Sequence, residues 1–255
     1  MLKNDLREYR YSSIFFILVA VGIIAALSEV IIGEDSNLAT IITGIVGSIG
    51  NFIIFAGLLN TRMGSVSDYL SNIRLINLKV IVVNLAVYIL LTGIGILLGT
   101  GTIISAAILN SGDMTIYFVI FVILLYGIFY LLTAHINFVL SDRRFRNLGF
   151  IETLGLVIKT GFKLSGKTLV LALKYYLLPI LLVLFIVLGG ANGDVNSLAF
   201  LLFGILAIYL IILVFLLPGF VARLSDIYLD YIEENYPYEP SDFENDKEED
   251  KFYLD

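Results

Sequence analysis

The sequence contains no cysteine and no tryptophan, and its 255 residues include one histidine and four prolines. Without cysteine the chain can form no disulfide, no cysteine-ligated zinc site and no iron–sulfur cluster. A single histidine cannot supply an ordinary histidine-based metal site, and a cysteine–histidine nucleophile pair is excluded as well. We therefore expect no catalytic residues, no metal, no cofactor and no enzymatic activity.

Charge is also scarce. Charged residues make up 15% of the chain and apolar residues 59%, and the mean hydropathy is +0.95. An average soluble domain is about a quarter charged, and a chain of this length cannot bury so much apolar surface in water. The apolar runs are continuous rather than alternating, which predicts helices. The fold class that follows is an all-α, polytopic integral membrane protein.

Six apolar runs are long enough to cross a bilayer, which takes about 20 helical residues each. They lie at 12–32, 38–60, 80–98, 115–140, 169–188 and 198–221. Short connections pair them into three hairpins, which predicts a single membrane domain over residues 1–225.

The basic residues predict the orientation of these spans. All sixteen lie on the side of the two chain termini, in the end segments, in the connections that follow the second and fourth spans, or just inside the fifth span. The three opposite loops carry only acids, namely Glu34, Asp35, Asp113 and Asp194. By the positive-inside rule both termini are cytoplasmic, and the expected location is the cell membrane.

Residues 226–255 have a different composition from the rest. They hold twelve acidic residues and two lysines, few aliphatic side chains, and prolines at 237 and 240. Such a segment buries too little apolar surface to fold alone, so a disordered cytoplasmic tail is predicted. It is either a solvated terminus or a docking segment for a cytoplasmic or membrane protein partner.

The string GFKLSGKT matches the nucleotide-binding pattern G-x-x-x-x-G-K-[ST] through Gly161, Gly166, Lys167 and Thr168. A true phosphate loop follows a buried strand, so that its backbone N–H groups converge on phosphate at a helix N-terminus. The residues that precede Gly161 have helical periodicity instead, and a predicted span follows Thr168. The match is therefore interpreted as a decoy, with Gly166 ending a helix and no nucleotide bound.

That preceding helix, predicted over residues 148–164, is amphipathic. Glu152, Lys159 and Lys163 fall on one face of it and apolar residues on the opposite face, with Leu156 as the exception, as in a helix lying in the membrane interface. Membrane lipids are the expected ligands, and nucleic acid is not. The candidate headgroup contacts are Arg143, Arg144, Arg146, Lys159, Lys163 and Lys167.

Four polar residues inside the predicted spans are candidate intramembrane contacts, namely Glu29, Asn51, His135 and Asn137. Polar groups in spans tend to face neighbouring helices, so we expect His135 to form an interhelical hydrogen bond. Asn51 follows three glycines that permit close helix approach, which favours a helix contact, with the lining of a solute pathway as the alternative. Glu29 is either a wetted interfacial acid or an ion contact.

Two segments, FVLSDRRFRNLGFIETLGLVIKTGFKLSGKTLVLALKYYLLPILL and LPGFVARLSDIYLDYIEE, resemble a broad group of bacterial six-span proteins. That group includes the membrane domain found with some glycerophosphodiester phosphodiesterases and related membrane proteins of unknown function. The resemblance covers roughly the C-terminal half and implies a six-helix membrane domain. It carries over no catalytic residue, because the phosphodiesterase barrel and its acid/histidine cluster are missing from this sequence.

Three functions remain open at this point. The first is a non-enzymatic subunit or accessory protein of a membrane or transport assembly. The second is a small-solute transporter or channel, and the third is an anionic-lipid binding or handling protein.

Overall fold

The computed structural model describes residues 7–33, 37–109, 112–190 and 196–237, and every regular element in these ranges is a helix. The longer helices are α1 (Tyr11–Ile32), α2 (Asn37–Asn60), α4 (Leu78–Leu109), α5 (Gly112–Thr133), α7 (Phe150–Gly190) and α8 (Asn196–Asn235). The short elements are α3 (Val66–Ser71), η1 (Asn72–Leu75), α6 (Ile136–Ser141) and η2 (Arg143–Phe145).

Several of these helices can cross a membrane by length and composition. Within the described residues four segments qualify, and they are Tyr11–Ile32, Ile41–Asn60, Leu124–Ser141 and Gly204–Asn235. A fifth is obtained if Val66–Leu75 and Leu78–Ile94, which meet at 94°, form one bent span. The protein is therefore an all-helical chain with four or five helices able to span a bilayer.

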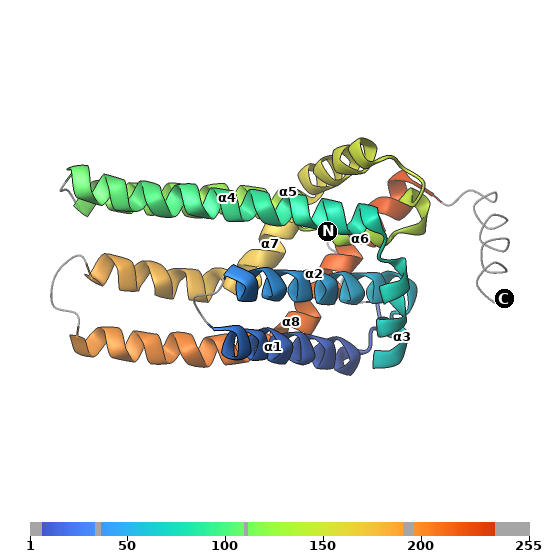
Figure 1. The fold of residues 1–255 in the computed structure, drawn as a ribbon, viewed down its shortest axis with the longest axis horizontal. Coiled ribbons are helices and arrows are strands. Elements are labelled where there is room, and N and C mark those ends of the chain that lie inside the picture. The colour runs from blue at the N-terminus through green and yellow to red at the C-terminus, as the bar shows by residue number, and fades with distance from the viewer. Residues whose placement is uncertain (1–6, 34–36, 110–111, 191–195, 238–255) are drawn as a thin grey trace.

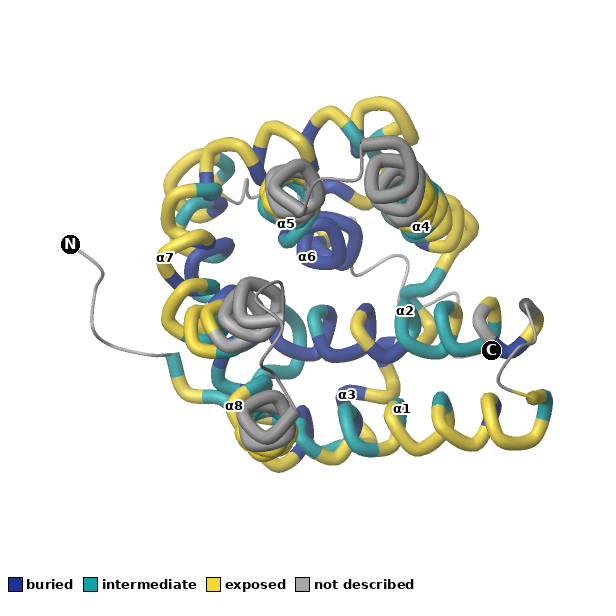
Figure 2. Tube along the Cα trace, turned by 90° about the vertical axis from the view of Figure 1, so that its left-hand side faces the viewer, coloured by how far each residue is buried: buried dark blue, intermediate teal, exposed yellow. Residues whose placement is uncertain are grey.

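The short elements gather at one end of the bundle (Figure 1). We call this end the polar layer: residues 7–10, α3, η1, α6, η2, the first turns of α7 and the last turns of α8. Much of the buried core lies here, whereas the long helices show many exposed aliphatic side chains toward their other ends. The six residues of α6 are all buried, and Figure 2 shows this helix enclosed by the others.

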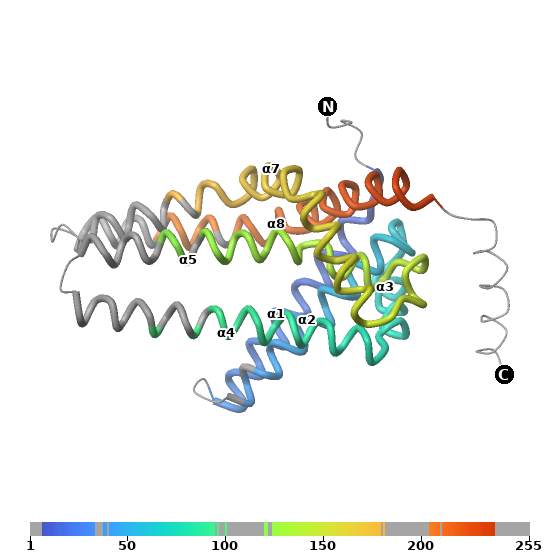
Figure 3. Tube along the Cα trace, turned by 90° about the horizontal axis from the view of Figure 1, so that it is seen from above, coloured from blue at the N-terminus to red at the C-terminus, as the bar shows by residue number. Residues whose placement is uncertain are grey.

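The helices α1 and α2 form a tight hairpin that diverges from α4 (Figure 3). Their close approach depends on Gly50, because a Cβ at that position would collide with the side chain of Val21. A hydrogen bond between the hydroxyls of Ser28 and Thr43, at 3.0 Å, joins the same two helices further along.

The predicted span over 115–140 is interrupted. The helix α5 ends at Thr133, and the chain turns through Ala134 and His135 before α6 begins. The interruption lies where α7 crosses, since Gly161 of α7 packs against the backbone of Leu132 so closely that a Cβ would not fit.

Two further helices extend beyond their predicted ends, namely the interfacial helix predicted over 148–164 and the third span predicted over 80–98. The helix α7 runs without a break from Phe150 to Gly190, so Gly166 ends no helix and the predicted interfacial helix and fifth span are one element. A glycine inside a helix costs only about 1 kcal/mol relative to alanine, and the buried stripe through Thr160, Leu164, Thr168 and Leu171 crosses this point. The helix α4 continues to Leu109, because residues 99–109 stay apolar.

The boundary predicted at residue 226 is wrong. The helix α8 continues to Asn235, and its last turns bury Leu224, Ile227, Tyr228 and Ile232 in the polar layer. These positions recur at helical spacing, so the segment has an apolar face despite its many acids. Residues 238–255, which are the rest of the predicted tail, lie outside the described residues.

Candidate functional site

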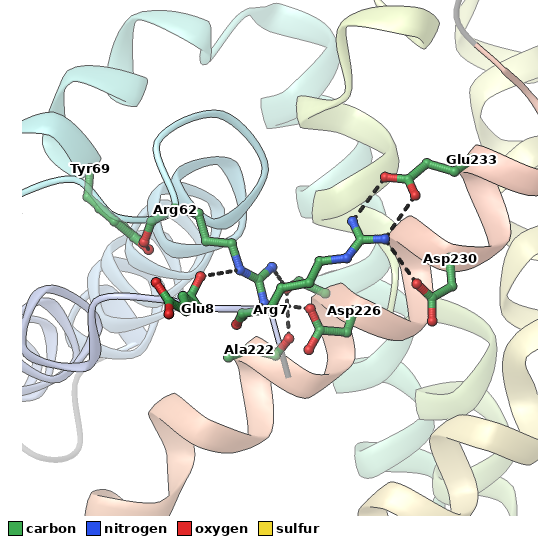
Figure 4. A network of polar contacts seen from close by, with 9 residues as sticks. Arg7, Glu8, Arg62, Tyr69, Ala222, Asp226, Asp230 and Glu233 are labelled. Carbon is green, nitrogen blue, oxygen red and sulfur yellow. Dashed lines mark hydrogen bonds and ion pairs between the residues drawn. The ribbon is translucent and has the colours of Figure 1, made fainter. Parts of the chain in front are cut away.

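The polar layer contains a network of ion pairs that joins the N-terminal arm, residues 7–10, to the last turns of α8 (Figure 4). The guanidinium of Arg7 donates hydrogen bonds to Glu233 at 2.8 and 2.9 Å and to Asp230 at 3.0 Å. The hydrogen bond to Glu233 raises the pKa of Arg7 above its usual value, so this residue keeps its charge. Because all three side chains are substantially exposed, these pairs contribute little stability and serve mainly to hold the N-terminal arm in place.

Arg62, which follows α2, lies at the centre of this network. Its guanidinium pairs with Asp226 and donates to the Ser225 hydroxyl at 2.7 Å and to the backbone carbonyls of Glu8 and Arg7 at 2.9 and 3.2 Å. The side chains of Arg62 and Asp226 are only 14% and 17% exposed, so this pair is far better shielded from water than the Arg7 pairs. A single residue thus joins the N-terminal arm, the end of α2 and α8.

The connection between α2 and α3 holds Arg62 in position. The Tyr69 hydroxyl donates to the Arg62 carbonyl at 2.9 Å, and the buried ring lies against Gly57 with no room for a Cβ. Ser65 and Asp68 form a capping box that starts α3, each side chain accepting from the other residue's backbone N–H. The hydrogen bonds from Ser65 also lower the pKa of Asp68.

A second, more deeply buried pair lies between α6 and α8. Asp142 accepts from the Arg144 side chain at 2.7 and 2.9 Å and from the Tyr228 hydroxyl at 3.0 Å. The side chains of Asp142 and Arg144 are 4% and 8% exposed. The ring of Tyr228 stacks on Phe138, which in turn packs against Phe55 of α2. One buried carboxylate therefore connects the α6–α7 connection to α8.

Arg144 was expected to contact lipid headgroups, and the structure contradicts this because its guanidinium is buried on Asp142. The neighbouring Arg143 and Arg146 are exposed. Lys79 of α4 also holds the connection between α6 and α7 in place, because its ammonium donates hydrogen bonds to the carbonyls of Phe145, Arg146 and Leu148 at 2.9–3.3 Å.

His135 lies in a buried polar cluster between α5, α6 and α7. Its Nε2 is 2.9 Å from the Thr168 hydroxyl, and neither residue is exposed. Within the described residues three further buried atoms have no hydrogen-bond partner, namely Nδ1 of His135, Oδ1 of Asn137 and Oγ1 of Thr160. His135 and Asn137 thus share the interior of the polar layer.

The other two polar candidates lie elsewhere. Glu29 is exposed one turn before the end of α1. Asn51 is also exposed, although it was expected to bond across a helix contact. The close contact between α1 and α2 falls one residue earlier, at Gly50, and a step of one residue turns a helical side chain by about 100°. The structure does not bring Glu29 or Asn51 into the cluster around His135.

The residues of the phosphate-loop match lie within one helix. Gly161 and Thr168 face the interior of the layer, whereas Gly166 and Lys167 are exposed. Helical backbone N–H groups are engaged in i→i−4 hydrogen bonds, so no loop is present there to cradle phosphate.

The outer surface of α7 is divided between apolar and basic side chains. Ile151, Ile158 and Phe162 are 55–82% exposed along one strip, and Lys159, Lys163 and Lys167 are exposed beside it. Of the apolar face that the sequence predicts for this helix, Val157 and Leu164 are buried, whereas Phe150 and Ile158 are exposed; Leu156 is buried as well. Lys159 donates to the Tyr236 hydroxyl at 3.0 Å, which raises the pKa of that lysine.

The described residues contain no group of three or more histidine, cysteine, aspartate or glutamate side chains that could hold a metal ion. No protein-family model, no curated protein and no solved structure matches this chain.

Proposed function

We propose that this protein is a six-span integral membrane protein that acts without catalysis, as a subunit or accessory protein of a membrane or transport assembly. In this proposal both termini are cytoplasmic and the polar layer is the cytoplasmic face. The gathering of the ends of α1, α2, α4, α5 and α8 at one end of the bundle supports a common side for the basic connections. The resemblance to bacterial six-span proteins would fit the same topology.

The length of α7 supports the same arrangement. At 1.5 Å per residue its 41 residues extend about 62 Å, roughly twice the hydrocarbon thickness of about 30 Å. The first turns of the helix pack within the polar layer, which leaves the second half, beyond Lys167, for a fifth span. The second half of α7 and the first half of α8 then form the third hairpin.

The observation that carries the functional proposal is the network around Arg62. It joins the N-terminal arm, the α2–α3 connection and the end of α8 into one rigid unit. This unit places the last described turn of α8, with Asp230, Glu233 and Glu234 exposed, at the start of the acidic segment. This acidic platform and the eight acids that follow Pro237 in the sequence together suit a protein partner that carries basic side chains.

Affinity isolation from native membranes in mild detergent, followed by mass spectrometry, tests this proposal. The full chain is compared with a chain ending at Pro237, which keeps every buried residue of α8. A matched control keeps all 255 residues and replaces the eight acids after Pro237 by asparagine or glutamine. We expect a stoichiometric partner that is lost from both altered chains. Recovery of the full chain without any protein partner, or solute flux by the purified protein in liposomes, would refute the proposal.

A second candidate function, anionic-lipid binding, is favoured by the outer surface of α7. The exposed apolar strip suits the acyl region and the lysines beside it suit lipid phosphates. Replacing Lys159, Lys163 and Lys167 by glutamine is expected to lower retention of anionic over zwitterionic lipid during purification. Unchanged retention would rule this surface out. The transporter alternative has weaker support, since Asn51 faces outward and the cavity between α2 and α4 is lined almost entirely by hydrocarbon.

A further inference from the structure

An apolar groove runs between α2 and α4. Figure 3 shows the α1–α2 hairpin diverging from α4. Its volume is about 460 Å³, within the range of about 300–1,000 Å³ that is usual for small-molecule sites. From α2 it is lined by residues between Ile41 and Phe52, and from α4 by residues between Val80 and Ile89, with Ile76 at one end.

The dimensions of the groove limit what can occupy it. From Ile41 to Phe52 the helix α2 rises about 17 Å, so the groove is long for its volume. An elongated apolar groove of this size suits an extended hydrocarbon chain.

The lining also favours hydrocarbon. It is aliphatic and aromatic apart from Ser48 and Asn84, and the amide of Asn84 donates to the Val80 carbonyl of its own helix at 3.0 Å. Ile45, Leu85 and Ile89 are 49–59% exposed, so the groove opens into the apolar outer surface that a bilayer would cover. A polar solute would find few hydrogen-bond partners here, whereas an acyl chain needs none.

A cationic residue lies close in sequence to one end of the groove. The elements α3 and η1 meet α4 at 94°, and Arg74 of η1 lies two residues before Ile76. Arg74 is exposed, and the described residues offer it no hydrogen bond or ion pair, in contrast to Arg7 and Arg62. From Val80 to Ile89 the helix α4 rises about 14 Å, close to half the hydrocarbon thickness of about 30 Å. The groove thus extends from the polar layer to about the depth at which one leaflet ends.

We propose that this groove binds one acyl chain of an anionic phospholipid from the leaflet next to the polar layer, with its phosphate beside Arg74. This lipid site is separate from the acidic platform, and it does not depend on the proposed assembly function. The guanidinium supplies the charge and hydrogen-bond donors that a phosphate accepts. The groove supplies the apolar contact that distinguishes a held lipid from one that only touches the protein surface.

The absence of tryptophan allows a direct test with the full chain, because a single introduced tryptophan is the only indole in the protein. Leu85→Trp places the reporter in the groove lining. Leu90→Trp serves as the matched control. Leu90 lies five residues further along α4, and its side chain is 56% exposed but does not line the groove. Each variant in mild detergent is titrated with phosphatidylglycerol brominated on its acyl chains, since bromine quenches tryptophan on contact.

We expect quenching of Leu85→Trp to saturate near one lipid per protein, and quenching of Leu90→Trp to rise without saturation. Adding Ser48→Phe, which fills the groove from α2, should abolish the saturable component and leave the control curve unchanged. Identical curves for the two reporters would overturn the proposal, because the groove lipid would then exchange like any other. Absence of quenching at Leu85→Trp would also overturn it and would indicate that protein covers the groove.

The headgroup contact is tested in the Leu85→Trp background. Arg74→Gln should weaken binding of the brominated anionic lipid about fivefold, the effect of one basic residue near anionic headgroups. It should leave binding of brominated phosphatidylcholine unchanged. Arg223→Gln, at an exposed basic residue of α8 to which no lipid contact is assigned, should change neither titration. Equal behaviour of the two variants would refute the contact between Arg74 and the phosphate.

Discussion

Replacing each of three glycines of α7 by alanine should change the stability of the protein in opposite directions. The comparison tests the close contact between α7 and α5. A Cβ at Gly161 would lie closer than 3.0 Å to the carbonyl oxygen of Leu132, whereas a Cβ at Gly155 or Gly166 would meet nothing within 4 Å. Replacing glycine by alanine inside a helix gains up to about 1 kcal/mol from backbone entropy and solvation. At Gly155 and Gly166 this gain should appear undiminished as increased stability.

At Gly161 the gain is opposed by overpacking. The obstacle is backbone rather than a flexible side chain, so α7 must move away from α5. Inserting a methyl group into a packed contact costs about 1–3 kcal/mol. Because the propensity gain is common to both variants, the difference between Gly161→Ala and Gly155→Ala isolates this cost.

The assay is thermal unfolding of the three variants in mild detergent, followed by circular dichroism at 222 nm. For a chain of this size the expected difference is roughly 2–12 °C in apparent Tm between Gly161→Ala and Gly155→Ala. Equal stability of these two variants would refute the close crossing of α7 and α5. Loss of stability in Gly166→Ala would instead support the helix end at Gly166 that the sequence predicts, since alanine is disfavoured in the left-handed conformation of a C-terminal cap.

Three other predictions concern the polar layer, and each is measured by the same unfolding assay. Tyr228→Phe removes the hydrogen bond to the buried Asp142 carboxylate and should cost about 1.5–3 kcal/mol, whereas Tyr126→Phe, at an exposed position of α5, should cost nothing measurable. Arg62→Lys keeps the positive charge but loses the guanidinium hydrogen bonds to Asp226, Ser225 and two backbone carbonyls, so it should destabilise the protein by about 1–3 kcal/mol. Arg74→Lys, the control, should leave the stability unchanged. Equal effects of the two variants would contradict the central role of Arg62. Gly57→Ala should displace the Tyr69 ring and destabilise the protein, whereas Gly47→Ala, with nothing within 4 Å, should not; a stable Gly57→Ala would show that the ring does not lie there.

The predicted spans and the observed helices agree where the sequence pattern is strongest. Residues 12–32 and 38–60 are continuous apolar runs with clear ends, and α1 and α2 match them within one residue at each end. The scarcity of charge predicts helices apolar enough to span a bilayer, and the structure has four or five of them, because composition alone sets how much apolar surface a chain must bury. Neither conclusion depends on which helices are neighbours.

The end of α8 shows a signal that was present in the sequence but was masked by charge. The string ARLSDIYLDYIEEN carries apolar residues at helical spacing, and they are the ones that the polar layer buries. Net charge describes the solvent-facing side of such a helix and says nothing about its other side. A helical-moment analysis of residues 222–235 would have moved the start of the predicted tail past Asn235.

Other features could be decided only by the tertiary structure. Arg143, Arg144 and Arg146 are neighbours in sequence and alike in charge, yet only Arg144 is buried on Asp142, a carboxylate that also accepts a hydrogen bond from Tyr228, 86 residues further along the chain. Gly50 packs closely against α1 as expected, whereas Asn51 does not, because a step of one residue turns a helical side chain away from the contact. The helical character of this chain, and its segments long and apolar enough to span a bilayer, follow from the sequence alone, since those properties are sums over local residues. Long-range packing decided which polar residues pair, where α5 breaks and where the groove opens, because those depend on distances between segments far apart in the chain.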